Sequence, residues 1–249
     1  MRSPYRYSKL DSKFRKFWRN FFPMPVSSYT EGRVQNICAV QLVPPDKLIS
    51  SFESYIELLY TLRGPDIGSY MEFGVFNGSS MFCMHQALKN FGIRNPQLFG
   101  FDSFEGLQPG VENSNHGVFK PGFYKCSYET MCNCLHKRGL DPDKITWIPG
   151  WFDQTLNQIA ISKYGLENPG IVFIDCDSYE ASKTILDFIA PLIKKPIIIC
   201  LDDWSLYDLD LKEDGEYRSF NEFLENNPHL RADRISTYIK KAKVFLIRP

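Results

Sequence analysis

The sequence predicts an α/β fold built on a doubly wound, mostly parallel sheet of seven strands. Two observations carry this prediction. Short apolar segments alternate along the chain with helical patterns, which is typical of parallel strands covered by helices on both faces. Residues 70–80 then show an apolar strand, a glycine-containing turn and the start of a helix, an arrangement that binds nucleotide-like ligands in such sheets.

Composition narrows the classes of function. The chain has 249 residues, a length that suits one α/β domain with extensions or two small domains. Hydrophobic residues make up 43%, which is enough for a sizeable core. The formal net charge is +0, which gives no general case for nucleic-acid binding. Because no apolar run is long enough to cross a bilayer, we also expect no transmembrane segment.

The cysteines favour a reducing compartment. There are 7 of them, and Cys132 and Cys134 form an isolated Cys-x-Cys without a second pair. Structural zinc sites need four ligands, so this pair is a poor zinc candidate. We therefore expect reduced thiols and a cytoplasmic location.

Residues 1–64 are predicted to form an extension in front of a domain at residues 65–249. Basic and aromatic side chains are interleaved in residues 1–24, and helical spacing places Phe14, Phe17 and Trp18 on one face. A helix on a membrane surface would show this pattern. So would an arm that docks on the core or on a neighbouring subunit. We expect docking on protein, which would allow homo-oligomers to form through the arm.

The remaining elements follow in order. The predicted helices span residues 45–62, 81–91, 127–138, 153–163, 179–189 and 217–226. The predicted strands span residues 70–73, 97–101, 144–148, 170–176, 196–201, 232–238 and 241–247. Pro44 and Pro45 start the first helix, and Gly64 followed by Pro65 ends it. Only Ile239 and Lys240 separate the last two strands, which predicts a hairpin and an antiparallel last strand.

The turn after residue 73 is the first candidate binding site. Gly74 and Gly78 would let the backbone approach a ligand, and the start of the following helix offers free N–H groups. Glu72 lies where a carboxylate can accept hydrogen bonds from a ligand hydroxyl or ammonium. The spacing is Glu-x-Gly-x-x-x-Gly, so the dinucleotide fingerprint is not met. A tight turn without a ligand would give the same pattern.

Acidic residues gather at the carboxyl ends of the predicted strands, the edge where open α/β sheets bind ligands. Asp102 follows the second strand, where an acid commonly binds ribose hydroxyls, although a helix or turn cap would use the same residue. Asp175 and Asp177 follow one strongly apolar strand, and Asp202 and Asp203 follow the next. The acids therefore converge on one edge of the sheet.

Clustered carboxylates repel one another unless a cation or shared protons compensate. Oxygen ligands from short Asp side chains suit magnesium. No histidine accompanies these strand ends, which argues against zinc. The alternative is that the acids are independent caps of the helix that begins at Tyr179 and of the loop after Asp203.

Four segments together resemble the macrocin O-methyltransferase family. They read Tyr-Met-Glu-Phe-Gly-Val at 70–75, Gly-Phe-Asp-Ser-Phe-Glu-Gly-Leu at 100–107, Ile-Asp-Cys-Asp-Ser-Tyr-Glu at 174–180 and Asp-Asp-Trp at 202–204. The resemblance covers about residues 70–226, and Trp204 stands where the family more often has tyrosine. It implies a Rossmann-like class I methyltransferase that transfers a methyl group from S-adenosylmethionine to a sugar hydroxyl.

The resemblance also implies residue roles. The residues that would hold the methionine end and backbone of S-adenosylmethionine are Glu72, Gly74, Gly78 and Ser79. Asp102 would bind the ribose, with Ser103 beside it. The residues that would line the adenine pocket are Gly150, Trp151 and Phe152. The residues that would ligate Mg²⁺ and support catalysis are Asp175, Asp202 and Asp203; Asp175 is also expected at the cofactor, and Asp177 lies behind the ligands.

This chemistry needs few parts. Methyl transfer is an in-line displacement, so the enzyme mainly positions and deprotonates the acceptor. A metal on two vicinal hydroxyls would lower the pKa of one of them, and a carboxylate or a nearby base would take the proton. His116 and Lys120 are candidates to line the acceptor site. The alternatives are a non-sugar acceptor, or a cofactor-binding scaffold that has lost catalysis, which the intact acids disfavour.

Overall fold

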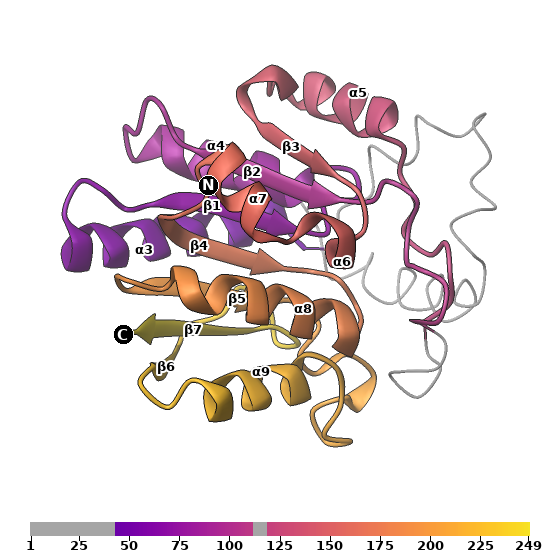
Figure 1. Ribbon diagram of the computed structural model, residues 1–249. Coiled ribbons are helices and arrows are strands. Elements are labelled where there is room, and N and C mark those ends of the chain that lie inside the picture. Colours follow the sequence, from indigo (N-terminus) through magenta and orange to yellow (C-terminus); the bar gives the residue numbers. More distant parts are fainter. Residues whose placement is uncertain (1–42, 112–118) are drawn as a thin grey trace, which may run out of the picture.

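The computed structural model describes residues 43–111 and 119–249, which form a seven-stranded sheet between two layers of helices (Figure 1). The sheet order is β3-β2-β1-β4-β5-β7-β6. The strands are β1 (Ser69–Phe73), β2 (Leu98–Asp102), β3 (Thr146–Pro149), β4 (Pro169–Ile174), β5 (Ile197–Leu201), β6 (Arg231–Ile235) and β7 (Lys243–Arg248). Strands β1 to β5 are parallel, whereas β7 runs antiparallel to β5 and β6. The predicted fold class is confirmed.

Helices cover both faces of the sheet. They are α3 (Pro45–Arg63), α4 (Ser79–Asn90), α5 (Tyr128–Arg138), α6 (Phe152–Thr155), α7 (Gln158–Tyr164), α8 (Tyr179–Ile189) and α9 (Gly215–Asn226). Short 3₁₀ turns lie at Pro142–Lys144, Ala190–Leu192 and Leu206–Asp208. The buried hydrophobic residues of α3, α4 and α5 belong to one core cluster, and those of α7, α8 and α9 belong to the other. The two clusters therefore lie on opposite faces of the sheet.

The central strands are apolar on both sides because each face meets a helical layer. In β4, Phe173 faces the α3 layer, where its ring lies 5.8 Å from that of Phe52, whereas Val172 and Ile174 belong to the opposite cluster. All five residues of β5 are buried. This explains why the sequence shows continuous apolar runs here in place of an alternating pattern.

Two predicted boundaries are wrong, each for a local reason. The single helix expected at residues 153–163 is two helices, because Asn157 adopts an extended backbone and accepts a hydrogen bond from the N–H of Ala160. It thereby caps the N-terminus of α7 and interrupts the helical backbone that begins with α6. The last two strands are joined by residues 236–242, a wider turn than the two residues expected. The hydroxyl of Thr237 holds this turn by donating to the carbonyls of Ile239 and Ala242.

The predicted extension shares the core of the domain from Pro45 onward. Five residues of α3 are buried in the same cluster as β1 and β4. The aromatic arm at residues 1–24 lies outside the described residues. Within the described ranges, no helix is both long and apolar enough to cross a membrane.

Most of the described cysteines are free, as expected. The free thiols are Cys83, Cys126, Cys132, Cys176 and Cys200.

Candidate functional site

A cavity of about 500 Å³ opens at the carboxyl ends of the parallel strands. Its walls come from the loops after β1, β2, β3, β4 and β5, so every parallel strand contributes. Of the predicted site residues, those that line it are Gly74, Ser79, Asp102, Ser103, Gly150, Trp151, Phe152, Asp175, Asp177 and Asp203. Glu72, Gly78 and Asp202 are not among the lining residues. The volume falls in the range of small-molecule sites, roughly 300–1,000 Å³.

The β1–α4 turn is shaped by close contact with the end of β4. Gly74 has φ +88°, and a Cβ atom at this residue would lie 1.8 Å from the carbonyl oxygen of Asp175. Gly78 has φ +73° and precedes α4, whose first two residues, Ser79 and Ser80, line the cavity. This turn therefore brings a helix N-terminus, a favourable place for a polar ligand, beside the first acid of the cluster.

Asp102 braces this turn from β2. Its Oδ2 accepts hydrogen bonds from the N–H groups of Val75 at 2.7 Å and Phe76 at 3.0 Å, and its Oδ1 accepts one from Phe104 at 2.7 Å. Burial raises the pKa of the carboxyl, and these three N–H groups act against the rise. Asp102 lines the cavity and also fixes the backbone on both sides of it. Asp102 can therefore hold the loops in place and also contact a ligand in the cavity.

Glu72 lies in the interior beneath the turn. It is fully buried, and its two oxygens accept hydrogen bonds from Ser80 at 2.6 Å and Tyr70 at 2.7 Å. Burial raises the pKa of Glu72 to about 8, against the effect of these two donors. The side chain supports the first turn of α4 through Ser80 and does not line the cavity.

Glu72 should make folding stability depend on pH. Its carboxyl has a pKa of about 8 in the folded chain and an ordinary value of 4.5. Because the folded-state value is the higher one, its stabilising contribution is complete below 4.5 and is lost as the pH rises through about 8. Glu72→Gln should therefore flatten this part of the curve. Urea unfolding of both proteins across that window measures the difference, and parallel curves would contradict the assignment.

The turn after β3 supplies another wall of the cavity. Gly150 has φ +134°, and its N–H donates to the carbonyl of Asp102 at 3.0 Å. The Phe152 ring meets that of Phe73 edge to face at 6.0 Å, while Trp151 precedes α6. This turn therefore gives the cavity an apolar wall that contacts the end of β1.

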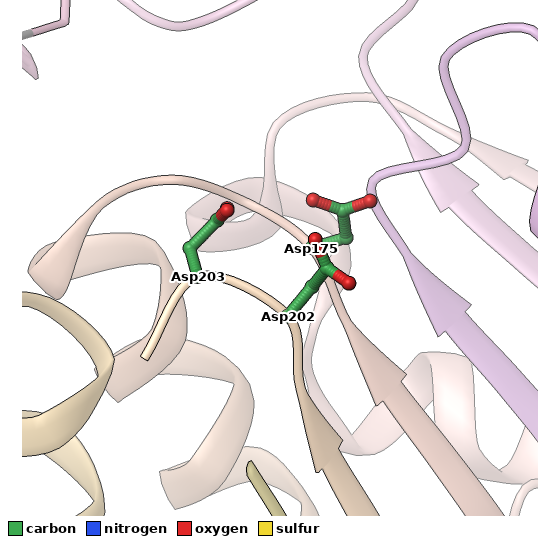
Figure 2. Close-up of side chains that lie close together, drawn as sticks. All are labelled: Asp175, Asp202 and Asp203. Carbon is green, nitrogen blue, oxygen red and sulfur yellow. The ribbon is translucent and has the colours of Figure 1, made fainter. Parts of the chain in front are cut away.

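Three carboxylates meet where β4 and β5 end. One oxygen from each of Asp175, Asp202 and Asp203 lies within 4.8 Å of the others, and Figure 2 shows the side chains rising from two adjacent strands. Asp202 and Asp203 are buried, and Asp175 is half-buried. Strands β4 and β5 are parallel neighbours, and Ile174 pairs with Leu201. This register brings the acids that follow the two strands together, as the sequence predicts.

Burial and mutual repulsion disfavour the charged forms of these acids. Burial raises the pKa of Asp175 well above its usual range, and the charges of Asp202 and Asp203 raise it further. Burial and the Asp203 charge raise the pKa of Asp177 in the same way. An additional cation would relieve this repulsion.

Sequence analysis missed one further carboxylate at this edge. Glu216, in the first turn of α9, is 1% exposed, and its Oε2 accepts the N–H of Asp203 at 2.9 Å. Burial and the Asp203 charge raise its pKa well above the usual range. Oε1 of Glu216 and Oδ2 of Asp203 are buried and find no hydrogen-bond partner among the described residues. These unsatisfied oxygens fit a site that takes a cation.

The β6–β7 turn also reaches the acids. The Tyr238 hydroxyl donates to Oδ1 of Asp202 at 2.7 Å. Lys241 Nζ lies 2.6 Å from Oδ2 of Asp202 and 2.7 Å from Oδ1 of Asp203. The N–H of Ser205 also donates to the carbonyl of Lys241 at 2.9 Å, so the two loops are joined through backbone and side chain.

A model of the macrocin O-methyltransferase family (TylF) matches residues 52–241. The chain belongs to this family. The match begins inside α3 and ends at Lys241, so it includes every cavity wall described above. The resemblance seen in the sequence is confirmed.

Two curated relatives of this macrocin O-methyltransferase family member are O-methyltransferases by their names. The chain is 25% identical over 146 residues to the 8-demethyl-8-(2,3-dimethoxy-alpha-L-rhamnosyl)-tetracenomycin-C 4'-O-methyltransferase of Streptomyces olivaceus, covering 56% of this chain and 54% of that one. It is 24% identical over 157 residues to the mycinamicin III 3''-O-methyltransferase of Micromonospora griseorubida, covering 58% of each. The chain thus spans little more than half the length of these relatives.

A solved structure supports the family fold. The O-methyltransferase NovP superimposes with a TM-score of 0.62 at 17% identity, covering 80% of this chain and 79% of that one. At this identity the likeness concerns the fold alone.

Two further residues complete the cavity of this family member. Tyr124 and Tyr207 line it beside the acids, and both have a left-handed backbone, with φ 57° and 54°. Such a conformation is uncommon for bulky residues and is often found at functional sites. Of the two acceptor-site candidates, Lys120 is exposed and does not line the cavity, while His116 lies outside the described residues.

Proposed function

We propose that this chain is an S-adenosylmethionine-dependent, magnesium-assisted O-methyltransferase that acts on a hydroxyl of a sugar or glycan. One observation carries the proposal: the β1–α4 turn and the carboxylates that end β4 and β5 open into the same cavity. Family membership and the relative named for a rhamnosyl substrate support it.

The cofactor would lie over the glycine turn. S-adenosylmethionine supplies an electrophilic methyl group on a sulfonium, so the chain has to bind it, aim the acceptor and remove a proton. Gly74 and Ser79 allow close approach at the start of α4, and Asp102 holds the turn in place. Trp151 and Phe152 offer an apolar wall for the adenine.

The acceptor would lie toward the acids. The donor set of Asp175, Asp202 and Asp203 consists of hard oxygens, and the unsatisfied Oδ2 of Asp203 leaves room for one more positive partner. Mg²⁺ at these carboxylates would orient two hydroxyls and acidify one. A carboxylate at this edge or a nearby base would take the proton. The rings of Tyr124 and Tyr207 would pack against the acceptor ring.

A panel of acceptors tests the proposal. The full chain would be incubated with labelled S-adenosylmethionine, Mg²⁺ and sugar glycosides, nucleotide sugars or catechols. Methylation of sugars supports the proposal, while methylation of catechols alone would favour a non-sugar acceptor. Cofactor binding without transfer to any acceptor would favour the silent scaffold.

Replacing Asp102 should weaken cofactor binding. Asp102→Ala removes three hydrogen bonds to the loops that frame the cavity and a candidate ribose ligand. We expect S-adenosylmethionine affinity to fall by about 1–3 kcal/mol, the scale of lost hydrogen bonds to a charged group. Calorimetric titration of the folded variant measures this, with Asp143→Ala on the surface as control. Unchanged affinity would count against the assignment.

Location and assembly also remain proposals. Five free thiols among the described residues agree with a reducing, cytoplasmic compartment. Homo-oligomers through the arm would be detected by comparing the sedimentation of the full chain with that of a chain lacking residues 1–24.

A further inference from the structure

A lysine already occupies the position of a cation in the acid cluster. Lys241 Nζ bridges Asp202 and Asp203 at 2.6 and 2.7 Å, and these two side chains are only 3% exposed. Two of the three carboxylates with metal-ligand geometry are therefore paired with an ammonium. Distances this short between charged groups in a buried setting mark a strong, charge-assisted interaction.

The cluster carries more acid than one ammonium can balance. Asp175 lies within 4.8 Å of both aspartates, and Glu216 accepts the N–H of Asp203 at 2.9 Å. Asp177 interacts electrostatically with Asp203. One lysine therefore reduces the repulsion without removing it, and the cluster retains affinity for a further positive charge. A divalent ion brings twice the charge and can bind several carboxylate oxygens at once.

The lysine and a divalent ion compete for the same groups. Two cations held a few ångströms apart in a buried site repel each other strongly. Lys241 can give way, because its side chain is 30% exposed, lines the open cavity and has a flexible four-carbon stem. Asp202 and Asp203 cannot move away as easily, because Tyr238 holds the carboxylate of Asp202 and Glu216 accepts the backbone N–H of Asp203.

We propose that Lys241 is a built-in counter-ion, which holds the carboxylates together in the metal-free protein and must be displaced when a divalent ion binds. The inference rests on the proposed metal site and adds a positioning residue to it. Binding of a divalent ion is then an exchange of cations. The affinity of the site for that ion is lower than it would be if Lys241 were not paired with the acids.

The decisive experiment compares Mg²⁺ binding and thermal stability among variants of the full chain. Lys241→Met keeps the length and apolar stem of the side chain but removes the charge. The control is Lys240→Met, because the neighbouring lysine is exposed and makes no salt bridge with the cluster among the described residues. Titration calorimetry with MgCl₂ gives the affinity, and melting in chelator and in Mg²⁺ gives the stability.

We expect Lys241→Met to bind Mg²⁺ at least about tenfold more tightly than wild type, and to melt at a lower temperature in chelator with recovery in Mg²⁺. Lys240→Met should match wild type in both measurements. Lys241→Arg should bind Mg²⁺ more weakly than wild type, because a guanidinium pairs with carboxylates through two donors. This variant keeps the test valid if Lys241→Met does not fold.

The outcomes separate the two proposals. If folded Lys241→Met binds Mg²⁺ no more tightly than wild type, or if Lys241→Arg binds it more tightly, Lys241 is not a counter-ion that the metal displaces. Either result would still agree with a metal site at the acids. Absence of Mg²⁺ binding in wild type but not in Lys241→Met would support the counter-ion strongly. Absence in every variant would overturn both.

Discussion

Asp202→Asn should lose most methyl transfer while it keeps its affinity for S-adenosylmethionine within a few fold. The substitution removes a negative charge from the carboxylate group that ends β4 and β5, and with it one proposed Mg²⁺ ligand. Metal assistance is worth several kcal/mol, so we expect a loss of roughly 100-fold or more. Cofactor affinity should persist because Asp202 is not among the residues that line the cavity, whereas Gly74 of the glycine turn is.

Methyl transfer to the best acceptor of the panel measures this effect, with calorimetry for the cofactor. Asp143→Asn, the same change at an exposed position, is the matched control. Chelator should reproduce the variant's defect in wild type, and Mg²⁺ should reverse it. Full activity of wild type in excess chelator would show that the acids work without a metal, and a general base would then have to replace it.

Gly74→Ala should be among the most destabilising single substitutions in the chain. The added Cβ would lie 1.8 Å from the carbonyl oxygen of Asp175, a backbone atom at the end of β4 that cannot move without disturbing the sheet. The φ of +88° adds strain for any residue with a side chain. Overpacking and strain together should cost about 3–5 kcal/mol in the free energy of unfolding.

Gly92→Ala is the control for the strain alone. Gly92 has φ +83°, but a Cβ atom added at this residue would have nothing within 4 Å of it. We expect a cost of about 1–2 kcal/mol there, from backbone strain. Urea denaturation of both variants gives the two costs. If they are equal, the contact between the β1–α4 turn and β4 is less rigid than we infer.

The sheet and its acidic edge could be predicted from the sequence because both follow from simple physics. A continuous apolar run such as residues 196–201 is typical of a central strand in a sheet that is covered on both faces. Once the strands are parallel, Asp175 and Asp202 must fall at the same edge. The two wrong element boundaries are caused by local hydrogen bonds. Asn157 caps a new helix within residues 153–163, and Thr237 holds a wider turn between the last two strands.

Side-chain contacts between residues far apart in the sequence could not be predicted in this way. Lys241 follows Lys240, and nothing in the local pattern separates the lysine that reaches the acids from its exposed neighbour. Glu216 lies in an amphipathic helix, where an acid normally faces solvent. Glu72 was expected at the ligand, but its partners are Ser80 and Tyr70, which only the packing of α4 on β1 reveals.

The place of β7 in the sheet has a consequence for how the chain is made. The strand is formed by residues 243–248, yet it lies inside the sheet between β5 and β6. Until it has been synthesised, β5 presents an open edge of five apolar residues, the kind of surface that promotes aggregation. Folding of this domain should therefore finish only after translation has passed residue 248, and a nascent chain stalled before β7 should depend on chaperones to stay soluble.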